Sequence, residues 1–374
     1  MPTITRKQPA KAAARYRPAG GGRSKGGGGR MPRDAVTLRE VAEAAGVHPG
    51  TASRALNDAT RALVRQETVE RVTAAATSLG YKPNLLARSF KTRRTNSVGV
   101  VIPDIDNPLF PPMVRGIESR LFQEGYVALL ANTEGGPDRQ RRIFESMVER
   151  RVDGLLLATA LRHDASLAEL ENAGIPVVLL NRVVEDRTFS SVSVDDAAGV
   201  GLVVEHLRSL GHRRIGHIAG PQSMSTGHAR YEGFVSAMEK TGADLEDRSV
   251  AFAESFSIGE GERCARRLFS VPDRPTAIVA GNDMLALGCY SAAERAGLGC
   301  PEDVSIVGFN DMPFIDRMNP PLTTVRIPHY EIGVHAAELL LGRLRDSGTP
   351  VKVVQLRPEL VVRGSTASVR AERR

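Results

Sequence analysis

The sequence predicts an α/β protein in which a small helical head precedes a core of doubly wound parallel sheets. From Ser97 onward, short Val/Ile/Leu runs alternate with helical patterns. Uninterrupted apolar strands at this rhythm are typical of parallel sheets covered on both faces. Before that point, three short helical patterns surround one glycine, Gly46. At 374 residues the chain exceeds one ordinary domain, so we expect two or three compact units.

The first quarter of the chain is strongly basic. Residues 1–95 contain 19 Lys and Arg against 6 Asp and Glu, whereas the remainder is mildly acidic. Residues 1–34 have no apolar periodicity and many glycines, so we expect a disordered basic tail. A cationic segment beside a helical head indicates a polyanionic partner, although a solvated tail would have the same composition. The chain has neither an apolar signal core nor a membrane-length apolar run, which favours a cytoplasmic protein.

The stretch VTLREVAEAAGVHPGTASRAL, residues 36–56, has the spacing of two helices joined by a tight turn. Thr37 and Glu40 are placed as a capping box, Gly46 suits a left-handed turn, and Pro49 suits the first position of a second helix. A third apolar stripe closes the bundle with Val69, Val72, Ala76 and Leu79. This pattern matches a helix-turn-helix, which offers its second helix to the DNA major groove, although a plain helical hairpin would look similar.

Several further signatures follow in a fixed order: GYKPN, SVGVVIPD, LGHRRIGHIAGP, ARYEGF, AGNDMLALG, DVSIVGFND and PPLTTV. Together with VTLREVAEAAGV and TASRAL, they resemble the lactose-repressor (LacI/GalR) family of bacterial transcription regulators. The resemblance covers Val36 to Gly364. It implies a helix-turn-helix that reads an operator half-site, a hinge helix in the minor groove, and a periplasmic-binding-protein-like core. In that family the core binds a small effector and dimerises.

These expectations divide the chain into five parts. They are a disordered basic tail (1–34), a helix-turn-helix DNA-binding domain (35–82), a hinge helix and linker (83–96), an effector-binding and dimerisation core (97–364), and a C-terminal tail (365–374). The core is too long for one sheet, so we expect two subdomains with a cleft between them. The chain should change over near Val194 and Asp195, with return crossings near Pro321 to Ile327 and near Lys352.

The resemblance places the DNA-binding residues in the head and the hinge. They are Thr37, Leu38, His48, Pro49, Gly50, Thr51, Ser53, Arg54, Asn57, Tyr81, Asn84, Ala87 and Phe90. Helical spacing also turns Thr51 and Arg54 outward, where they could meet base edges. Phe90 lies where most members have a leucine that wedges between central base pairs, and it is larger. His48 and Pro49 also depart from the usual residues, so the family's base preference cannot be transferred.

The effector-binding residues implied by the resemblance follow strand ends. They are Leu109, Phe110, Thr226, Arg230, Phe256, Asn282 and Asn310. The planar fork of Arg230 suits vicinal hydroxyls or a carboxylate, but this arginine could instead cap a helix or pair with an acid. Phe110 and Phe256 could equally be ordinary core residues. Asn310 replaces an aspartate that many members carry, which argues against a cationic effector.

Two other function classes compete with this interpretation. An enzyme is disfavoured because the sequence contains no nucleophile elbow, phosphate loop, HExxH motif or close carboxylate pair, so we predict no catalytic residues, metal or cofactor. A transport-type solute-binding protein would have a similar core but no use for a helix-turn-helix. We therefore predict an allosteric repressor that binds double-stranded operator DNA as a homodimer or tetramer. A carbohydrate or related metabolite is the expected effector, and inducer and co-repressor both remain open.

Overall fold

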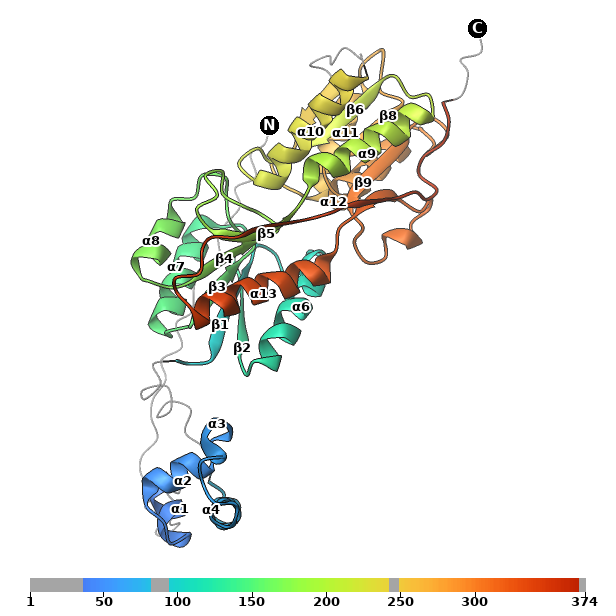
Figure 1. The fold of residues 1–374 in the computed structure, drawn as a ribbon. Helices are drawn as coiled ribbons and strands as arrows, with labels where there is room; N and C mark the ends of the chain where they lie inside the picture. Colours follow the sequence, from blue (N-terminus) through green and yellow to red (C-terminus); the bar gives the residue numbers. More distant parts are fainter. Residues whose placement is uncertain (1–35, 82–93, 242–248, 370–374) are drawn as a thin grey trace, which may run out of the picture. The chain divides into compact units, whose positions relative to one another are not determined.

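The computed structural model describes residues 36–81, 94–241 and 249–369, which belong to two compact units, residues 1–84 and 85–374 (Figure 1). The predicted basic tail lies outside the described residues, as do the hinge residues Asn84, Ala87 and Phe90.

The first unit is a small helical bundle. Its helices are α1 (Leu38–Ala44), α2 (Pro49–Ala55), α3 (Asp58–Arg61) and α4 (Gln66–Leu79). The three expected helices are present, and α3 adds one turn between the second and the third. Small apolar side chains of α1, α2 and α4 form the core: Val41, Ala42, Ala45, Ala52, Ala55, Val69, Val72 and Ala76. The prediction that Leu79 closes this core was wrong, since its side chain is 39% exposed where Gly80 turns the chain in a left-handed conformation.

The second unit contains two six-stranded sheets, and all neighbouring strands of the first run parallel. Its order is β11-β5-β4-β3-β1-β2. The strands are β1 (Ser97–Ile102), β2 (Val127–Asn132), β3 (Gly154–Leu157), β4 (Val177–Leu180), β5 (Ser190–Val194) and β11 (Val353–Leu356). One face packs against α6 (Phe110–Gln123) and α13 (His329–Arg345), and the other against α7 (Pro137–Glu149) and α8 (Ser166–Asn172).

The second sheet has the order β12-β10-β9-β8-β6-β7 and repeats this arrangement, except that β12 runs antiparallel to β10. The strands are β6 (Ile215–Ala219), β7 (Val250–Phe252), β8 (Ala277–Ala280), β9 (Ser305–Asn310), β10 (Thr323–Arg326) and β12 (Glu359–Val361). The helices α9 (Asp196–Ser209) and α10 (Ser225–Lys240) cover one face, and α11 (Ile258–Phe269) and α12 (Asp283–Arg295) cover the other. A short 3-10 turn, η2 (Ile315–Arg317), follows β9. The predicted doubly wound class is confirmed.

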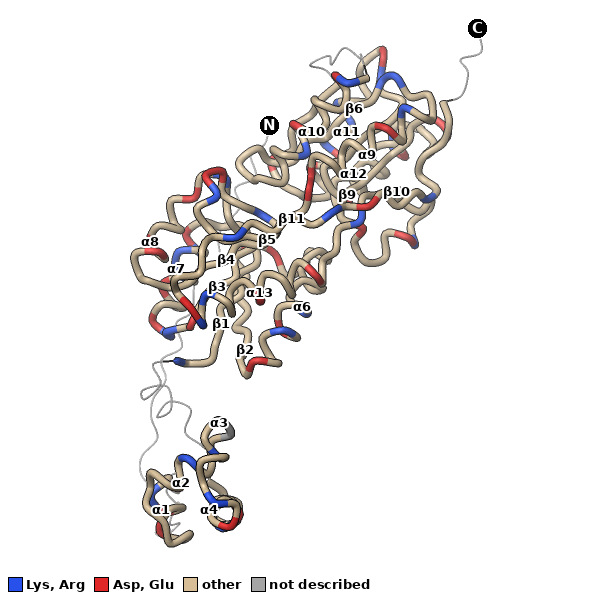
Figure 2. The backbone as a smooth tube through the Cα atoms, viewed as in Figure 1, with Lys and Arg blue, Asp and Glu red and all other residues tan. Residues whose placement is uncertain are grey.

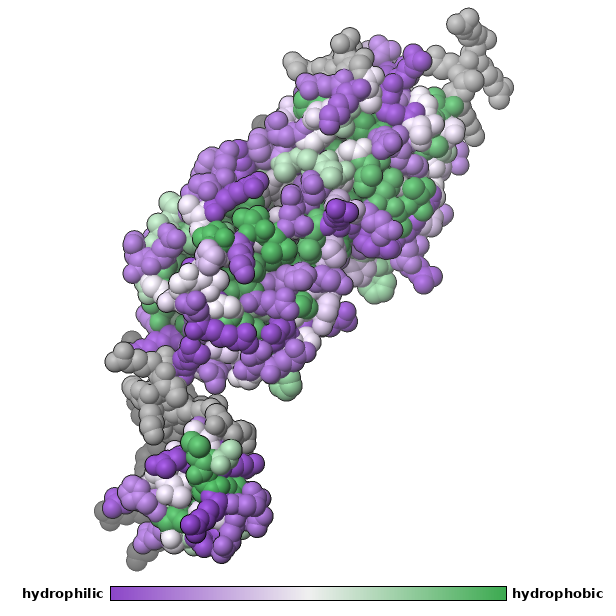
Figure 3. Space-filling model, viewed as in Figure 1, coloured by the Kyte–Doolittle hydropathy of each residue, from purple (hydrophilic) through white to green (hydrophobic). Residues whose placement is uncertain are grey.

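The strand sequences explain why both sheets are buried between helices. No charged residue occurs in β1, β3 or β4, whose segments are tan in Figure 2. Strands of this kind lose stability unless apolar partners cover both faces. On the face of the core unit shown in Figure 3, hydrophilic residues predominate and hydrophobic side chains appear in separate patches. Within the described part of the chain, no helix is both long and apolar enough to cross a membrane.

Each sheet and the helices that cover it form one subdomain of the second unit. Three segments of the chain join the two subdomains. The first follows Val194 at the end of β5, and the second follows Arg326 at the end of β10, both as predicted. The third crossing was predicted too early: Lys352 leads into β11, which pairs with β5 in the first sheet. The backbone carbonyl of Lys352 accepts a 2.9 Å hydrogen bond from the amide of Ser191, which keeps this residue in the first subdomain. The chain crosses between β11 and β12 instead, at residues 357–358.

Two glycines permit the close approach of α6 and α13. A Cβ at Gly333 would lie 2.0 Å from the backbone oxygen of Met113, and one at Gly116 would lie 2.2 Å from that of Tyr330. Because backbone atoms cannot yield as a side chain can, we expect Gly333→Ala to lower the free energy of unfolding by about 1–3 kcal/mol. Gly342 lies on the same helix in open space, so Gly342→Ala should raise it by about 0.5–1 kcal/mol. Urea unfolding of both variants checks this, and equal effects would contradict it.

Candidate functional site

The local sequence of the head fixes the turn between α1 and α2. The backbone amide of Thr37 donates to Glu40 Oε2 at 2.6 Å, and the amide of Glu40 donates to Thr37 Oγ1 at 3.4 Å, so the predicted capping box is present. Gly46 has a φ of +62°, which ends α1. The His48 ring then caps α2, since its Nδ1 accepts a 3.1 Å hydrogen bond from the amide of Gly50.

The expected DNA-binding residues divide by exposure. On α2, Ala52 and Ala55 are completely buried, which leaves Arg54 exposed and Thr51 and Ser53 half-buried. The side chains of Thr37 and His48 are also exposed, whereas Pro49, Gly50 and Asn57 are half-buried. Leu38 and Tyr81 are half-buried and pack against the core of the head. The second helix therefore presents Arg54, in its last turn, to solvent beside the half-buried Thr51 and Ser53, as the spacing predicts.

A cavity lies between the two subdomains of the second unit, and it brings all seven predicted effector residues together. Its empty volume is about 320 Å³, which includes space open to solvent. The lining residues are Asn107, Leu109, Phe110, Asn181, Arg182, Thr226, Arg230, Phe256, Asn282 and Asn310. Most follow the carboxyl ends of strands in the two sheets, where doubly wound folds bind ligands.

Sequence reasoning missed three of these ten residues. Asn181 and Arg182 come directly after β4, and Asn107 comes shortly after β1. The strand-end rule that singled out Asn282 and Asn310 applies equally to them. A search of every strand end would have found them.

Arg230 is held in the wall of the cavity by a set of specific contacts. Its Nε donates to Asp196 Oδ1 at 2.7 Å, and its Nη1 donates to the backbone oxygen of Gly281 at 2.6 Å. Its Nη2 lies 3.4 Å from Asn310 Oδ1. Its guanidinium carbon lies 3.8 Å from the centroid of the Phe309 ring. Arg230 thus lines the cavity and also pairs with an acid. Two of the possibilities that the sequence left open for this residue therefore both apply.

The pair formed by Arg230 and Asp196 is buried, with exposed fractions of 3% and 7%. Burial raises the pKa of the Asp196 carboxyl, and the charge and hydrogen bond of Arg230 oppose that rise. Three different groups accept hydrogen bonds from Arg230, and these contacts fix the position of its guanidinium group.

Two lining asparagines have unusual backbone conformations. Asn181 has a φ of +64° and Asn310 a φ of +119°, in a region that residues other than glycine seldom adopt. Such conformations cost free energy and gather at functional sites, where the surrounding structure holds them. Both amides line the cavity at the ends of their strands, β4 and β9.

The aromatic residues of the cavity have different surroundings. Phe110 is 1% exposed and belongs to the hydrophobic core as well as to the cavity wall, so the core alternative applies to it in part. The ring of Phe256 packs against Gly220, where a Cβ would lie 2.3 Å from the ring. Phe256 also packs against a cluster of buried hydrophobic side chains, so it is both a wall of the cavity and, in part, a core residue.

Hydrogen bonds join the subdomains beside the cavity. The amide of Val183 donates to Ser225 Oγ at 2.9 Å, and the amide of Arg162 donates to the backbone oxygen of Ser223 at 2.8 Å. The Arg162 side chain also donates to the backbone oxygen of Gln222 at 3.2 Å. These hydrogen bonds can form only at one separation of the subdomains. A ligand that binds in the cavity and changes this separation would therefore break or strengthen them.

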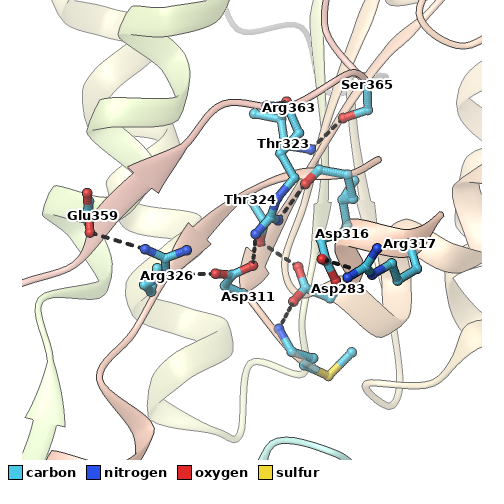
Figure 4. A network of polar contacts seen from close by, with 12 residues as sticks. Asp283, Asp311, Asp316, Arg317, Thr323, Thr324, Arg326, Glu359, Arg363 and Ser365 are labelled. Atoms are coloured by element: carbon cyan, nitrogen blue, oxygen red, sulfur yellow. Dashed lines mark hydrogen bonds and ion pairs between the residues drawn. The ribbon is translucent and has the colours of Figure 1, made fainter. Parts of the chain in front are cut away.

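A polar network links β10 of the second sheet to the start of α12 and to the loop after β9 (Figure 4). Asp283 accepts hydrogen bonds from Thr324 Oγ1 at 2.5 Å and from the amide of Met312 at 2.8 Å. Asp311 pairs with Arg363 at 2.6 Å and with Arg326 at 2.8 Å. Burial raises the pKa of Asp283 to about 7. The network ties β10 to the loop after Asn310, next to the second crossing.

Two buried histidines of the second subdomain have structural partners. His212 Nδ1 lies 2.9 Å from Thr276 Oγ1, and His217 Nδ1 lies 2.8 Å from the backbone oxygen of Val279. Cys264 and Cys289 are buried with free thiols. Across the described ranges, no group of three or more His, Cys, Asp or Glu side chains could hold a metal ion.

Comparison with known proteins decides the family. The model for bacterial regulatory proteins of the lacI family matches residues 37–84, and that for a periplasmic binding protein-like domain matches residues 204–366. The HTH-type transcriptional repressor CytR of Escherichia coli strain K12 is 34% identical over 336 residues, which span 90% of this chain and 97% of that protein. The chain belongs to the lacI family of bacterial regulatory proteins.

Other members of the lacI family support the assignment. The ribose operon repressor of Escherichia coli strain K12 is 34% identical over 88% of this chain and 99% of its own length. Among solved structures, the lac repressor dimer bound to operator and an anti-inducer has a TM-score of 0.79 at 28% identity, over 89% of this chain and 100% of that one. The complex of the regulator CelR with cellobiose has a TM-score of 0.68 at 31% identity, over 88% and 99%. The named relatives are transcriptional repressors rather than enzymes.

Proposed function

We propose that this lacI-family chain is a sequence-specific transcriptional repressor whose affinity for operator DNA is controlled by a small effector. One observation carries the proposal: the same chain presents a helix-turn-helix with an exposed polar edge and a cavity between two hydrogen-bonded subdomains. A solute-binding protein for transport would account for the cavity but not for the head. An enzyme would require a reactive group in the cavity, whose lining residues are instead asparagine, threonine, arginine and apolar side chains.

In the proposed DNA complex, two copies of the chain place their α2 helices in successive major grooves of a pseudo-palindromic site. Lysine and arginine side chains of the head contact phosphates and set the register, while Thr51, Ser53 and Arg54 face base edges. The hinge residues Asn84, Ala87 and Phe90, which lie outside the described residues, remain proposed minor-groove contacts. A homodimer or a tetramer of this chain in the cytoplasm would suit such a site.

The proposed effector occupies the cavity and touches both subdomains. Asn107, Asn181 and Phe110 approach from the first subdomain, and Arg230 and Asn282 from the second. A ligand held by both sides changes the free-energy difference between subdomain arrangements, and so between states that bind DNA strongly or weakly. The coupling must be reciprocal and is typically about 1–3 kcal/mol. Amide and guanidinium groups suit hydroxyl-rich ligands, so a carbohydrate or related metabolite is the proposed class.

Selection of binding sites from a random double-stranded DNA library tests the proposal. The purified full chain should enrich a two-fold related sequence, and a gel shift with that sequence should give sequence-dependent binding. Adding sugars and related metabolites to the selected complex should reveal one that changes its affinity. If the chain enriches no sequence at all, the repressor proposal fails, whatever the cavity binds.

Replacement of Arg54 should weaken recognition of the selected sequence. We expect Arg54→Ala to reduce affinity for it by about 1–3 kcal/mol, because an exposed arginine that meets a base edge contributes that much. Arg65→Ala removes the same charge from an exposed position before α4. Any loss of affinity in this variant should be similar for the selected and the scrambled DNA sequences. Fluorescence anisotropy with the selected duplex and a scrambled one measures both. If Arg54→Ala binds the two duplexes as the unmodified chain does, Arg54 is not a base contact.

A further inference from the structure

The charged side chains that line the cavity are all positive. Its ten lining residues include two arginines, Arg182 and Arg230, and no aspartate or glutamate. The polar positions at the ends of β4 and β9 are amides, Asn181 and Asn310. A cavity that must orient a neutral polyol usually combines donors with acceptors, and carboxylates are the strongest acceptors available. The acceptors in this cavity are neutral amide and hydroxyl oxygens, and the charged side chains among its lining residues are both arginines.

The two arginines differ in whether a carboxylate of the protein compensates their charge. Arg230 pairs with Asp196 and also donates to Gly281 and Asn310, so its charge is compensated within the protein. Arg182 is 9% exposed, and its Nε has no hydrogen-bond partner. Within the described part of the chain, no carboxylate lies within ion-pair distance of Arg182. Its backbone amide is engaged, since it donates to the carbonyl of Leu180 at 2.7 Å, but its guanidinium is not.

Burial without a partner destabilises the charged form of Arg182. Desolvation, with a smaller contribution from the nearby charge of Arg230, lowers the pKa of Arg182 to about 10. The side chain therefore stays charged at neutral pH although it is buried. Buried charges are normally paired, because leaving water is costly without a compensating partner. An arginine in this position is a candidate for a partner that arrives from outside.

The acidic residues around the cavity cannot easily supply that partner. Asp196 already binds Arg230. Asp283 is completely buried, and its two carboxyl oxygens accept from Thr324 and Met312. Both acids are therefore engaged within the second subdomain, and neither forms an ion pair with Arg182.

We propose that the cavity binds a hydroxylated small molecule that carries one acidic group, a carboxylate or a phosphate, and that this group pairs with Arg182. The amides of Asn107, Asn181 and Asn282 and the fork of Arg230 then contact its hydroxyls, and Phe256 packs against its apolar face. A sugar acid and a sugar phosphate share this chemistry. The inference rests on the proposed function of the cavity as the effector site, and it narrows the effector from neutral carbohydrates to anionic ones.

Thermal unfolding of the full chain in the presence of D-glucose, D-gluconate and D-glucose 6-phosphate tests the inference, with inorganic phosphate as a fourth probe. We expect the anions to stabilise the protein more than D-glucose does. Arg182→Gln should remove this preference and weaken the better anion by about tenfold to a hundredfold, the usual effect of losing a hydrogen bond to a charged group. Arg267→Gln removes the same charge from an exposed position on α11 and should leave the preference intact.

The outcomes separate the inference from the function on which it rests. A preference for gluconate over the two phosphates identifies a carboxylate partner, and the reverse identifies a phosphate partner. The inference is overturned if no anion stabilises the chain in a way that depends on Arg182, or if D-glucose binds equally well and Arg182→Gln does not change its affinity. Neither result affects the DNA selection experiment, whose failure would instead remove the repressor proposal.

Discussion

Arg230→Ala is expected to lower the free energy of unfolding of the core unit by about 3–5 kcal/mol and to abolish the response of DNA binding to the effector. The first effect follows from Asp196, which is 7% exposed and would lose the partner that its carboxylate contacts at 2.7 Å. The second follows from the place of Arg230 in the cavity wall. Urea unfolding measures the first, and effector titration of the DNA complex measures the second.

A second variant separates stability from ligand contact. In Arg230→Ala/Asp196→Asn the buried carboxylate is absent, so most of the lost stability should return while the effector response stays absent. The single variant should also recover partly at low pH. Burial already raises the pKa of Asp196, and loss of Arg230 removes the group that opposes that rise, so the carboxyl becomes protonated more readily. An effector response that survives in the double variant would place the site elsewhere.

The partner of Arg230 illustrates what the sequence could not supply. The arginine itself was predicted from the order of motifs, and it does line the cavity. Asp196 lies 34 positions earlier, at the start of α9, and nothing in its local sequence distinguishes it from Asp195, which caps the same helix. Only the packing of α9 against α10 brings Asp196 to Arg230. Long-range pairs of this kind depend on tertiary structure, so periodicity does not reveal them.

The fold could be predicted more fully than the site, because its pattern is repeated along the whole chain. Uninterrupted apolar strands indicated two parallel sheets, and the capping box of Thr37 marked the start of the head. The third crossing was predicted at the wrong position because β11 is a short edge strand in which alternate residues are exposed. Such a strand has a weaker sequence pattern than a central strand. A search of every strand end would have found Arg182 after β4, but nothing in the sequence sets this arginine apart from others that follow a strand. Its significance lies in burial without a partner, which is visible only in three dimensions.

Asp283→Asn is expected to remove a pH dependence of stability that the unmodified chain shows between about pH 4 and pH 8. Asp283 is completely buried, and desolvation is the main reason that its pKa is raised from the usual 3.8 to about 7. Its folded pKa exceeds its unfolded one, so its contribution to stability is full below pH 4 and is lost as the pH rises through 7. Three pKa units correspond to a loss on the order of 4 kcal/mol.

The geometry around Asp283 explains why asparagine should be tolerated there. The protonated acid can accept from the amide of Met312 with one oxygen and donate to Thr324 with the other, and an asparagine amide has the same pattern of acceptor and donor. Space is too limited for a larger group, because a Cβ at Gly308 would already lie 2.2 Å from Asp283 Oδ1. Asp283→Asn should therefore preserve the contacts of the protonated acid and have no charge to desolvate above pH 7.

Urea unfolding of the unmodified chain, Asp283→Asn and Asp273→Asn at pH 5 and pH 8 measures this effect. Asp273 is an exposed acid of the same unit, so its variant should follow the pH dependence of the unmodified chain and controls for the change in net charge. Asp283→Asn should gain stability relative to both at pH 8, and less at pH 5, where the unmodified acid is mostly protonated. Because the network of Figure 4 adjoins the second crossing, the same variant should also make effector binding less dependent on pH. A stability difference that is equal at the two pH values would mean that Asp283 is ionised throughout and that Thr324 and Met312 compensate its burial.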